Sequence, residues 1–266
     1  MRSPAPVTST DLLKLAGLAF VFADHFGLFF TPDDQWWRLA GRVAAPIFFF
    51  LIGFANTRKV PPSWIILGAM LTVLDVYNSG GLDYVTLNIL FDFALIRLTS
   101  PWIQAHILSK RGGLPAFALV CAAIIPLVGT IFEYGAEGWL WALFGLTARE
   151  AIISGTTEVR MQRNLVAVIC AAAYLYVEAR HFEFEPFQSA LLGTMICGLA
   201  LTLIRFRRAD IPFRAPAPIG FVLHWIGRHS LEIYAIGLFL MQLIGHFFED
   251  DPGGDHDSRR VTTSAN

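Results

Sequence analysis

Long apolar runs follow one another along nearly the whole chain, with short polar connections between them. A helix that crosses a bilayer needs about 20 mostly apolar residues, and somewhat fewer suffice within a bundle. The chain is 55% hydrophobic and 15% charged, well below the roughly 25% charged content of soluble domains. We therefore predict an all-α, polytopic transmembrane helix bundle of about nine spans. The predicted spans are residues 12–30, 39–57, 63–78, 84–100, 114–132, 137–153, 164–178, 187–206 and 229–248.

Two further segments do not fit a span. Residues 216–227 are too short to cross a bilayer alone, so they form either an interfacial helix or an extension of the last span. Residues 249–266 are polar and contain Gly and Pro, a composition typical of disorder. The chain is thus predicted to hold a single transmembrane domain, residues 1–248, followed by a disordered tail.

Basic and acidic connections alternate along the chain. The basic connections include Arg58 with Lys59 and the run 205–214, and the connections between them are acidic. Because cytoplasmic loops of membrane proteins are enriched in Lys and Arg, we predict a cytoplasmic N-terminus. An odd number of crossings would place the tail on the opposite side of the membrane.

Asp24 and His25 lie near the far end of the first predicted span. Such side chains cost several kcal/mol in hydrocarbon unless they are paired or face a cavity, so they indicate a functional site. Asn88 and Asp92 are four residues apart and share one helix face. The predicted orientation places these four residues at a depth similar to that of two more polar residues, Arg42 and Asp75.

Pro46 lies four residues after Arg42 inside the second predicted span. A proline within a helix removes one hydrogen bond and clashes with the carbonyl four residues back. We therefore expect a kink, with the Arg42 carbonyl free to face a cavity or a ligand. Gly41 and Gly53 would let the same span pack closely or bend.

These polar residues also have structural interpretations. Asp24 and Arg42 can form a buried ion pair that fixes helix packing, and Asn88 can bond across helices instead of touching a substrate. The Arg, His and Glu of segment 228–232 can cap or anchor a helix instead of binding a donor. His25 beside Asp24, however, suits proton transfer near neutral pH.

Composition also limits the partners. A net charge of −1 gives no indication of a nucleic-acid partner. Three cysteines without metal-ligand spacing argue against disulfides and zinc, so no metal is predicted. The lipid bilayer is the partner that the sequence itself implies.

Three stretches together resemble one known family. They read LLKLAGLAFVFADHFGLFF, WWRLAGRVAAPIFFFLIGFANTR and LNILFDFAL. They are similar to the TraX family of polytopic bacterial inner-membrane proteins, which includes the conjugative-pilin N-acetylase. The family motif positions correspond to Asp24, His25, Gly41, Arg42, Pro46, Phe48, Gly53, Arg58 and Asn88 to Phe91.

The resemblance implies transfer of an acetyl group from acetyl-CoA to an amine or hydroxyl acceptor, such as the N-terminus of a pilin or another small membrane protein. It implies that His25, oriented by Asp24, deprotonates the acceptor or carries the acyl group. Arg42 would stabilise the oxyanion or anchor an anionic group.

The resemblance also suggests where substrates bind. Arg58 and the basic run 205–214 would meet the donor's phosphates, and Asn88 with Asp92 would contact substrate. Segment 226–240, IGRHSLEIYAIGLFL, resembles the closing helix of wider membrane acyltransferase families, in which a histidine commonly follows the Ile-Tyr pair. Here that histidine is absent, which leaves His25 as the candidate base.

Two other functions fit the same residues. A transporter would also bury charges, although we find no internal repeat of the kind that many transporters contain. A non-enzymatic subunit of a pilus or a larger membrane complex would need the charges for assembly only.

Overall fold

The computed structural model describes residues 7–55, 57–79, 86–108, 112–128, 131–211 and 217–249. These residues are all-helical as predicted, and the described part of the chain contains only two isolated β-bridges and no strand. The helices are α1 (Ser9–Phe30), α2 (Gln35–Gly41), α3 (Ala44–Phe54), α4 (Pro62–Ser79), α5 (Ile89–Ile103), the π-helical η1 (Gln104–Leu108), α6 (Gly113–Val128), α7 (Gly135–Ser154), α8 (Thr157–His181), α9 (Pro186–Ile204), α10 (Ala217–Arg228) and α11 (Ser230–Glu249).

Each predicted span corresponds to a helix, with one exception. The predicted span 39–57 is divided, because α2 ends before Arg42 and α3 begins after Val43. Pro46 therefore lies in the first turn of α3, where a missing backbone N–H costs little. The kink expected at Pro46 thus takes the form of a two-residue turn at Arg42 and Val43, just before it.

Among the residues that the structure describes, three helical segments are long and apolar enough to cross a membrane: Ser9–Phe30, Gln35–Phe54 and Pro186–Ile204. Two shorter apolar helical segments, Gly113–Ile125 and Ser230–Gly245, fall below that length. The chain is therefore a membrane protein with several candidate spans, and a total of about nine stays a prediction.

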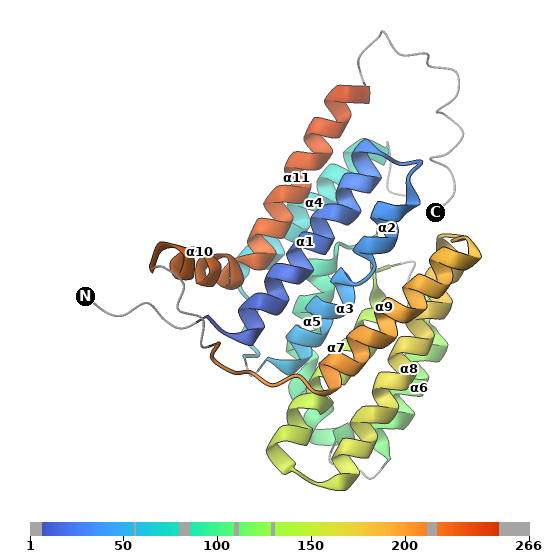
Figure 1. Cartoon of the computed structure of the whole chain (residues 1–266), viewed down its shortest axis with the longest axis vertical. Coiled ribbons are helices and arrows are strands. Elements are labelled where there is room, and N and C mark those ends of the chain that lie inside the picture. Colours follow the sequence, from blue (N-terminus) through green and yellow to red (C-terminus); the bar gives the residue numbers. More distant parts are fainter. Residues whose placement is uncertain are drawn as a thin grey trace.

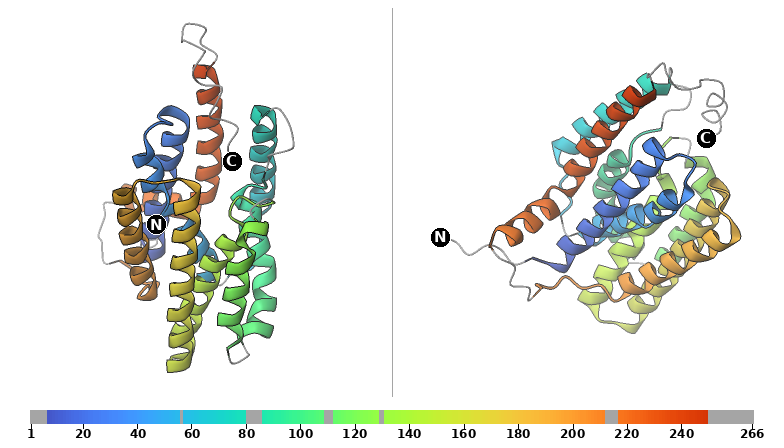
Figure 2. Two further views of the ribbon diagram at one scale, coloured as in Figure 1. Left: turned by 90° about the vertical axis from the view of Figure 1, so that its right-hand side faces the viewer. Right: turned by 45° about the horizontal axis from the view of Figure 1, so that its top comes forward.

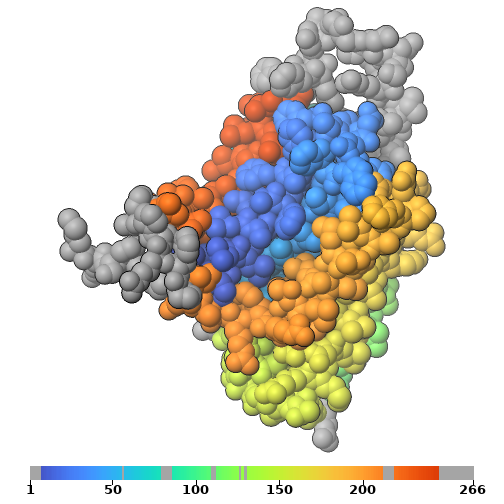
Figure 3. Space-filling model, viewed as in Figure 1, coloured from blue at the N-terminus to red at the C-terminus, as the bar shows by residue number. Residues whose placement is uncertain are grey.

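The long helices form an elongated bundle, and α3 and α7 pack against each other at its centre (Figures 1 and 2). The residues Ala44 to Gly53 of α3 are all buried. α1 packs against α2, α3 and α11, while α8 contacts α6, α7 and α9. In the space-filling view α1 and α2 lie on the surface beside α9 (Figure 3).

Local sequence explains where these helices start. Thr8 and Asp11 form a capping box at α1, and the side chains of Asp34 and Asn88 cap α2 and α5. Such caps satisfy backbone N–H groups that have no partner inside the helix. Asn88 therefore has a structural task in addition to any contact with a substrate.

Residues 217–228 form a separate helix, α10, which lies across the end of α11 (Figure 1). The alternative that this segment extends the last span is therefore wrong, because the helix is interrupted at His229. The predicted tail lies outside the described residues apart from Glu249.

Candidate functional site

Four charged side chains from α1, α2, α8 and the α2–α3 break form a cluster, which we call the charge cluster: Asp24, Arg38, Arg42 and Glu178. Asp24 Oδ2 lies 3.0 Å from Arg38 Nη1, and Asp24 Oδ1 pairs with Arg42 Nη2. Arg42 Nη1 lies 3.4 Å from Glu178 Oε2. Asp24, Arg42 and Glu178 are buried, so each charge depends on the others for compensation.

The break between α2 and α3 positions Arg42. Its Nε donates to the Arg38 carbonyl at 3.1 Å, and its guanidinium carbon lies 4.4 Å from the centre of the Phe182 ring. The carbonyl that Pro46 leaves without a helical partner accepts a hydrogen bond of 2.6 Å from the Tyr174 hydroxyl. This carbonyl is thus satisfied by α8 and does not face a ligand.

Gly41 makes the ion pair sterically possible. A Cβ at this position would lie 2.5 Å from Asp24 Cγ, closer than real Cβ atoms approach another heavy atom. Only glycine lets the end of α2 come this near to the carboxylate of Asp24.

His25 has a different environment from Asp24, although the two are adjacent. Consecutive residues on a helix do not face each other, and both Asp24 oxygens are engaged by arginines. Within the described residues, the buried Nδ1 of His25 has no hydrogen-bond partner. The imidazole is flanked by the rings of Phe29 and Tyr234, each with its centre 6.1 Å away. Asp24 therefore does not orient the imidazole by a hydrogen bond.

A small cavity of about 30 Å³, which we call the histidine cavity, lies beside His25. Its polar lining consists of Asp24, His25, Glu133, Tyr134 and Tyr234. A cavity needs about 10–15 Å³ to hold one water molecule. The histidine cavity therefore has room for two or three groups of the size of a water molecule.

Asn88 and Asp92 connect α5 to this cavity. Asn88 Nδ2 lies 3.5 Å from both Glu133 Oε2 and the Tyr234 hydroxyl oxygen. Asp92 Oδ2 accepts a bond from the Tyr134 N–H at 3.4 Å, while its buried Oδ1 has no partner in the described part of the chain. Both predicted substrate-binding residues thus hold the residues that line the histidine cavity.

Glu133 is the one carboxylate of this cavity outside a helix. Its Oε2 accepts a bond of 3.0 Å from the Ile89 N–H. Desolvation by the surrounding protein raises the pKa of the Glu133 carboxyl from 4.5 toward about 7, against the effect of this hydrogen bond. Water reaches the exposed side of the residue and limits the shift. Glu133 can therefore exchange protons near neutral pH.

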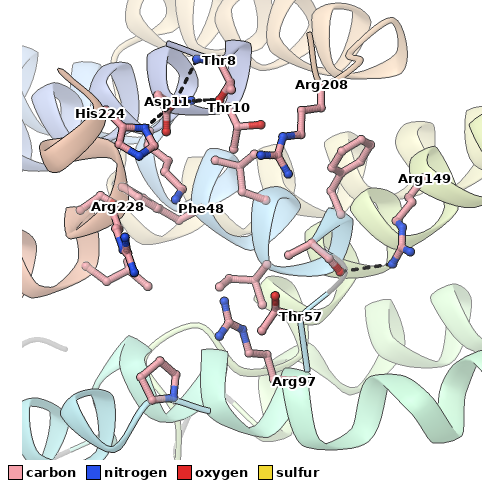
Figure 4. Close-up of a pocket in the computed structure, with 18 of the residues that line it drawn as sticks. Thr8, Thr10, Asp11, Phe48, Thr57, Arg97, Arg149, Arg208, His224 and Arg228 are labelled. Atoms are coloured by element: carbon pink, nitrogen blue, oxygen red, sulfur yellow. Dashed lines mark hydrogen bonds and ion pairs between the residues drawn. The ribbon is translucent and has the colours of Figure 1, made fainter. Parts of the chain in front are cut away.

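A much larger cavity of about 780 Å³, which we call the basic cavity, opens at the end of the bundle where α1 begins (Figure 4). Six Lys and Arg side chains and two acidic ones line it, together with His224. The basic residues are Lys14, Arg97, Arg149, Arg207, Arg208 and Arg228, and the acidic ones are Asp11 and Glu232. This excess of positive charge suits an anionic ligand.

The two cavities share a wall. Phe48 of α3 and Leu231 of α11 line both of them, and Figure 4 labels Phe48 among the residues around the basic cavity. Both side chains are buried. A ligand in the basic cavity is therefore separated from the histidine cavity by two apolar side chains.

The remaining candidates lie in several places. Arg58 does not line the basic cavity; burial and the nearby Arg149 lower the pKa of its guanidinium. Of the predicted basic run, Arg207 and Arg208 line the cavity, whereas Arg214 lies outside the described residues. Asp75 bonds to Gln242 at 2.7 Å and lines neither cavity.

Several participants cannot be identified from the sequence pattern. Glu137 and Glu178 stand at the ends of two predicted spans, but both are buried inside α7 and α8. Glu178 directly follows an apolar stretch. This position is the sequence signal that could have predicted its burial in the helix bundle. Tyr134, Tyr174 and Tyr234 gave no such indication. In the described part of the chain no group of acidic, His or Cys side chains could hold a metal ion.

A sequence model described as "TraX protein" matches residues 9–244 of the chain. A protein named TraX from Escherichia coli is 30% identical over 135 residues, which cover 49% of this chain and 52% of that protein. A second protein TraX, from Escherichia coli K12, is 29% identical over 171 residues, covering 62% and 63%.

An uncharacterized protein of Rickettsia prowazekii is 23% identical over 245 residues, which cover 88% of this chain and 91% of the relative. The match to the first Escherichia coli protein TraX spans about half of that protein's length. No solved structure matches this chain.

Proposed function

This chain belongs to the TraX family, and from that premise we propose that it is a membrane-embedded acetyltransferase. It moves an acetyl group from acetyl-CoA to an amine or hydroxyl acceptor. One observation carries the proposal: a large basic cavity and a small cavity lined by His25, whose buried Nδ1 has no partner among the described residues, share the wall of Phe48 and Leu231.

The basic cavity is the proposed donor site. Its volume of about 780 Å³ falls within the roughly 300–1,000 Å³ of ligand pockets. Arg207, Arg208 and Arg228 supply positive charge for phosphates. Arg58, behind this lining, adds to the positive potential without touching the donor.

His25 is the proposed base. The acceptor's amine or hydroxyl enters the histidine cavity and gives its proton to the imidazole as it attacks the thioester carbonyl. Asp24 lines the same cavity, and its negative charge stabilises the imidazolium that forms. Arg42 lines neither cavity and is paired with Asp24 and Glu178, so its proposed role is to hold Asp24 in place. Asn88 and Asp92 position the acceptor side of the cavity through Glu133 and Tyr134.

The proposed setting is a bacterial inner membrane with the N-terminus in the cytoplasm and about nine crossings. The basic cavity, which the start of α1 helps to line, then faces the cytoplasm, where the donor occurs. The proposed acceptor is a pilin N-terminus or another small membrane protein.

One observation favours a second function. The charge cluster is paired internally and buried, which also suits a non-enzymatic subunit that assembles with a pilus or a larger membrane complex. In that case the cavities would be incidental.

The test is to express the chain and its His25→Ala variant and to compare envelope proteins by mass spectrometry. We expect an acetyl increment that requires the chain and disappears with His25→Ala at unchanged protein level. His106→Ala, at an exposed histidine outside both cavities, is the matched control. Equal acetylation in the His25→Ala strain would refute the proposal, whereas impaired assembly without any acetyl mark would favour the second function.

A further inference from the structure

The two cavities differ about 26-fold in size, 780 Å³ against 30 Å³. The large one accommodates a bulky donor, but the small one admits only about two or three small groups. A group that reacts beside His25 must therefore be short, whatever carries it.

We propose that Phe48, together with Leu231, limits the transferred acyl group to two carbons. The inference rests on the proposed function and names the substrate class that the site accepts. In this arrangement the thioester carbonyl lies at the wall and the acetyl methyl lies in the histidine cavity.

The packing around Phe48 and Leu231 leaves these two side chains little room to move. Phe48 is buried, and a Cβ added to Gly17 of α1 would lie 3.0 Å from its Cε2. The ring thus rests against the backbone of α1 and cannot move farther in that direction. Leu231 is also buried, on α11. Every methylene beyond acetyl must therefore displace a side chain that lines the histidine cavity, Phe48 and Leu231 among them, or stay outside it.

The transfer step itself is independent of acyl length. The acceptor nitrogen or oxygen forms a bond to the carbonyl carbon, and the carbon–sulfur bond breaks. The proton that the acceptor gives to His25 passes to the departing thiolate, so the products are an acylated acceptor and a free thiol. Length discrimination therefore reports on the size of the histidine cavity, which Phe48 and Leu231 help to set.

The experiment uses inverted membrane vesicles that contain the chain, supplied with radiolabelled acetyl-, propionyl- or butyryl-CoA. We expect label transfer to membrane proteins to fall about 10- to 200-fold for each added methylene. Phe48→Ala should narrow the difference between acetyl and butyryl groups at least tenfold. Phe48→Leu, which retains more of the packing, should narrow it by a smaller factor.

Phe50→Leu is the matched control, because Phe50 is buried in the same helix and lines neither cavity. It should keep the wild-type discrimination. A second measurement needs no acceptor: the dissociation constants of ketone analogues, with CH₂ in place of the thioester sulfur, should rise with acyl length in the wild type and rise less in Phe48→Ala.

The experiment distinguishes a failure of the proposed function from a failure of the inference about acyl length. Wild-type vesicles that transfer no acyl group at all would overturn the proposed function, and this inference with it. Wild-type vesicles that transfer acetyl and butyryl groups equally well would overturn the inference alone. So would acetyl transfer whose length discrimination is the same in Phe48→Ala and Phe50→Leu.

Discussion

The contact between α3 and α7 predicts how one methyl group changes stability. A Cβ at Gly53 would lie 2.7 Å from the carbonyl carbon of Ala142, and closer still to its oxygen. A Cβ at Gly145 would lie 2.8 Å from the backbone nitrogen of Phe54. In both cases the obstacle is backbone, which cannot rotate away as a side chain can.

The magnitude follows from these distances. Ordinary van der Waals contact begins at 3.4 Å, so Gly53→Ala requires α3 and α7 to separate by at least 0.7 Å. Overpacking of this kind costs about 1–3 kcal/mol, and a backbone obstacle favours the upper end. At roughly 2–4 °C per kcal/mol for a chain of this size, the expected fall in Tm is about 6–12 °C.

The assay is thermal unfolding of the detergent-solubilised protein, with Gly193→Ala and Gly198→Ala as controls. A Cβ at either α9 glycine has no neighbour within 4 Å, so these variants should be neutral or about 1 kcal/mol more stable. Equal melting temperatures for Gly53→Ala and Gly193→Ala would refute the close approach of α3 and α7.

Three further predictions concern the site. Arg42→Leu leaves Glu178 without its cation and should lower the free energy of unfolding by about 3–5 kcal/mol, measured by thermal unfolding. Adding Glu178→Gln should restore part of this loss. Strictly additive losses in the double variant would contradict the pairing. Because the folded state raises the pKa of Glu133, the stability that this carboxyl contributes is fully present below about pH 4.5 and is lost as the pH rises through about 7. Glu133→Gln should remove this part of the dependence of Tm on pH, and an unchanged profile would contradict the prediction. Arg208→Ala should weaken acetyl-CoA binding about threefold to tenfold in isothermal titration, whereas Arg180→Ala, which lies outside the basic cavity, should not.

The helices could be predicted from the sequence because each is a long apolar run bounded by polar residues. The proximity of Asp24 and Arg42 could also be predicted, since both belong to neighbouring antiparallel spans at one depth. Pro46 indicated the irregularity beside Arg42, which in the structure is a two-residue turn between α2 and α3.

Other features lie beyond sequence patterns. α3 is buried on all faces, so its hydrophobicity does not indicate that Phe48 in particular faces both cavities. Glu178 meets Arg42 across 136 residues of chain, which no local periodicity reveals. Glu133 reaches Ile89 from a connection whose course depends on how α5 and α7 pack.

The charge cluster has a consequence for biogenesis. Asp24 precedes Arg42 by 18 residues, whereas Glu178 follows it by 136. At about 5–20 residues per second, Glu178 leaves the ribosome about 7–27 s after Arg42. Of its two carboxylate partners, Asp24 is therefore the one that is available to Arg42 while the first two predicted spans are made, and Glu178 can join only later. The order of synthesis thus neutralises the arginine before the rest of the bundle has been made.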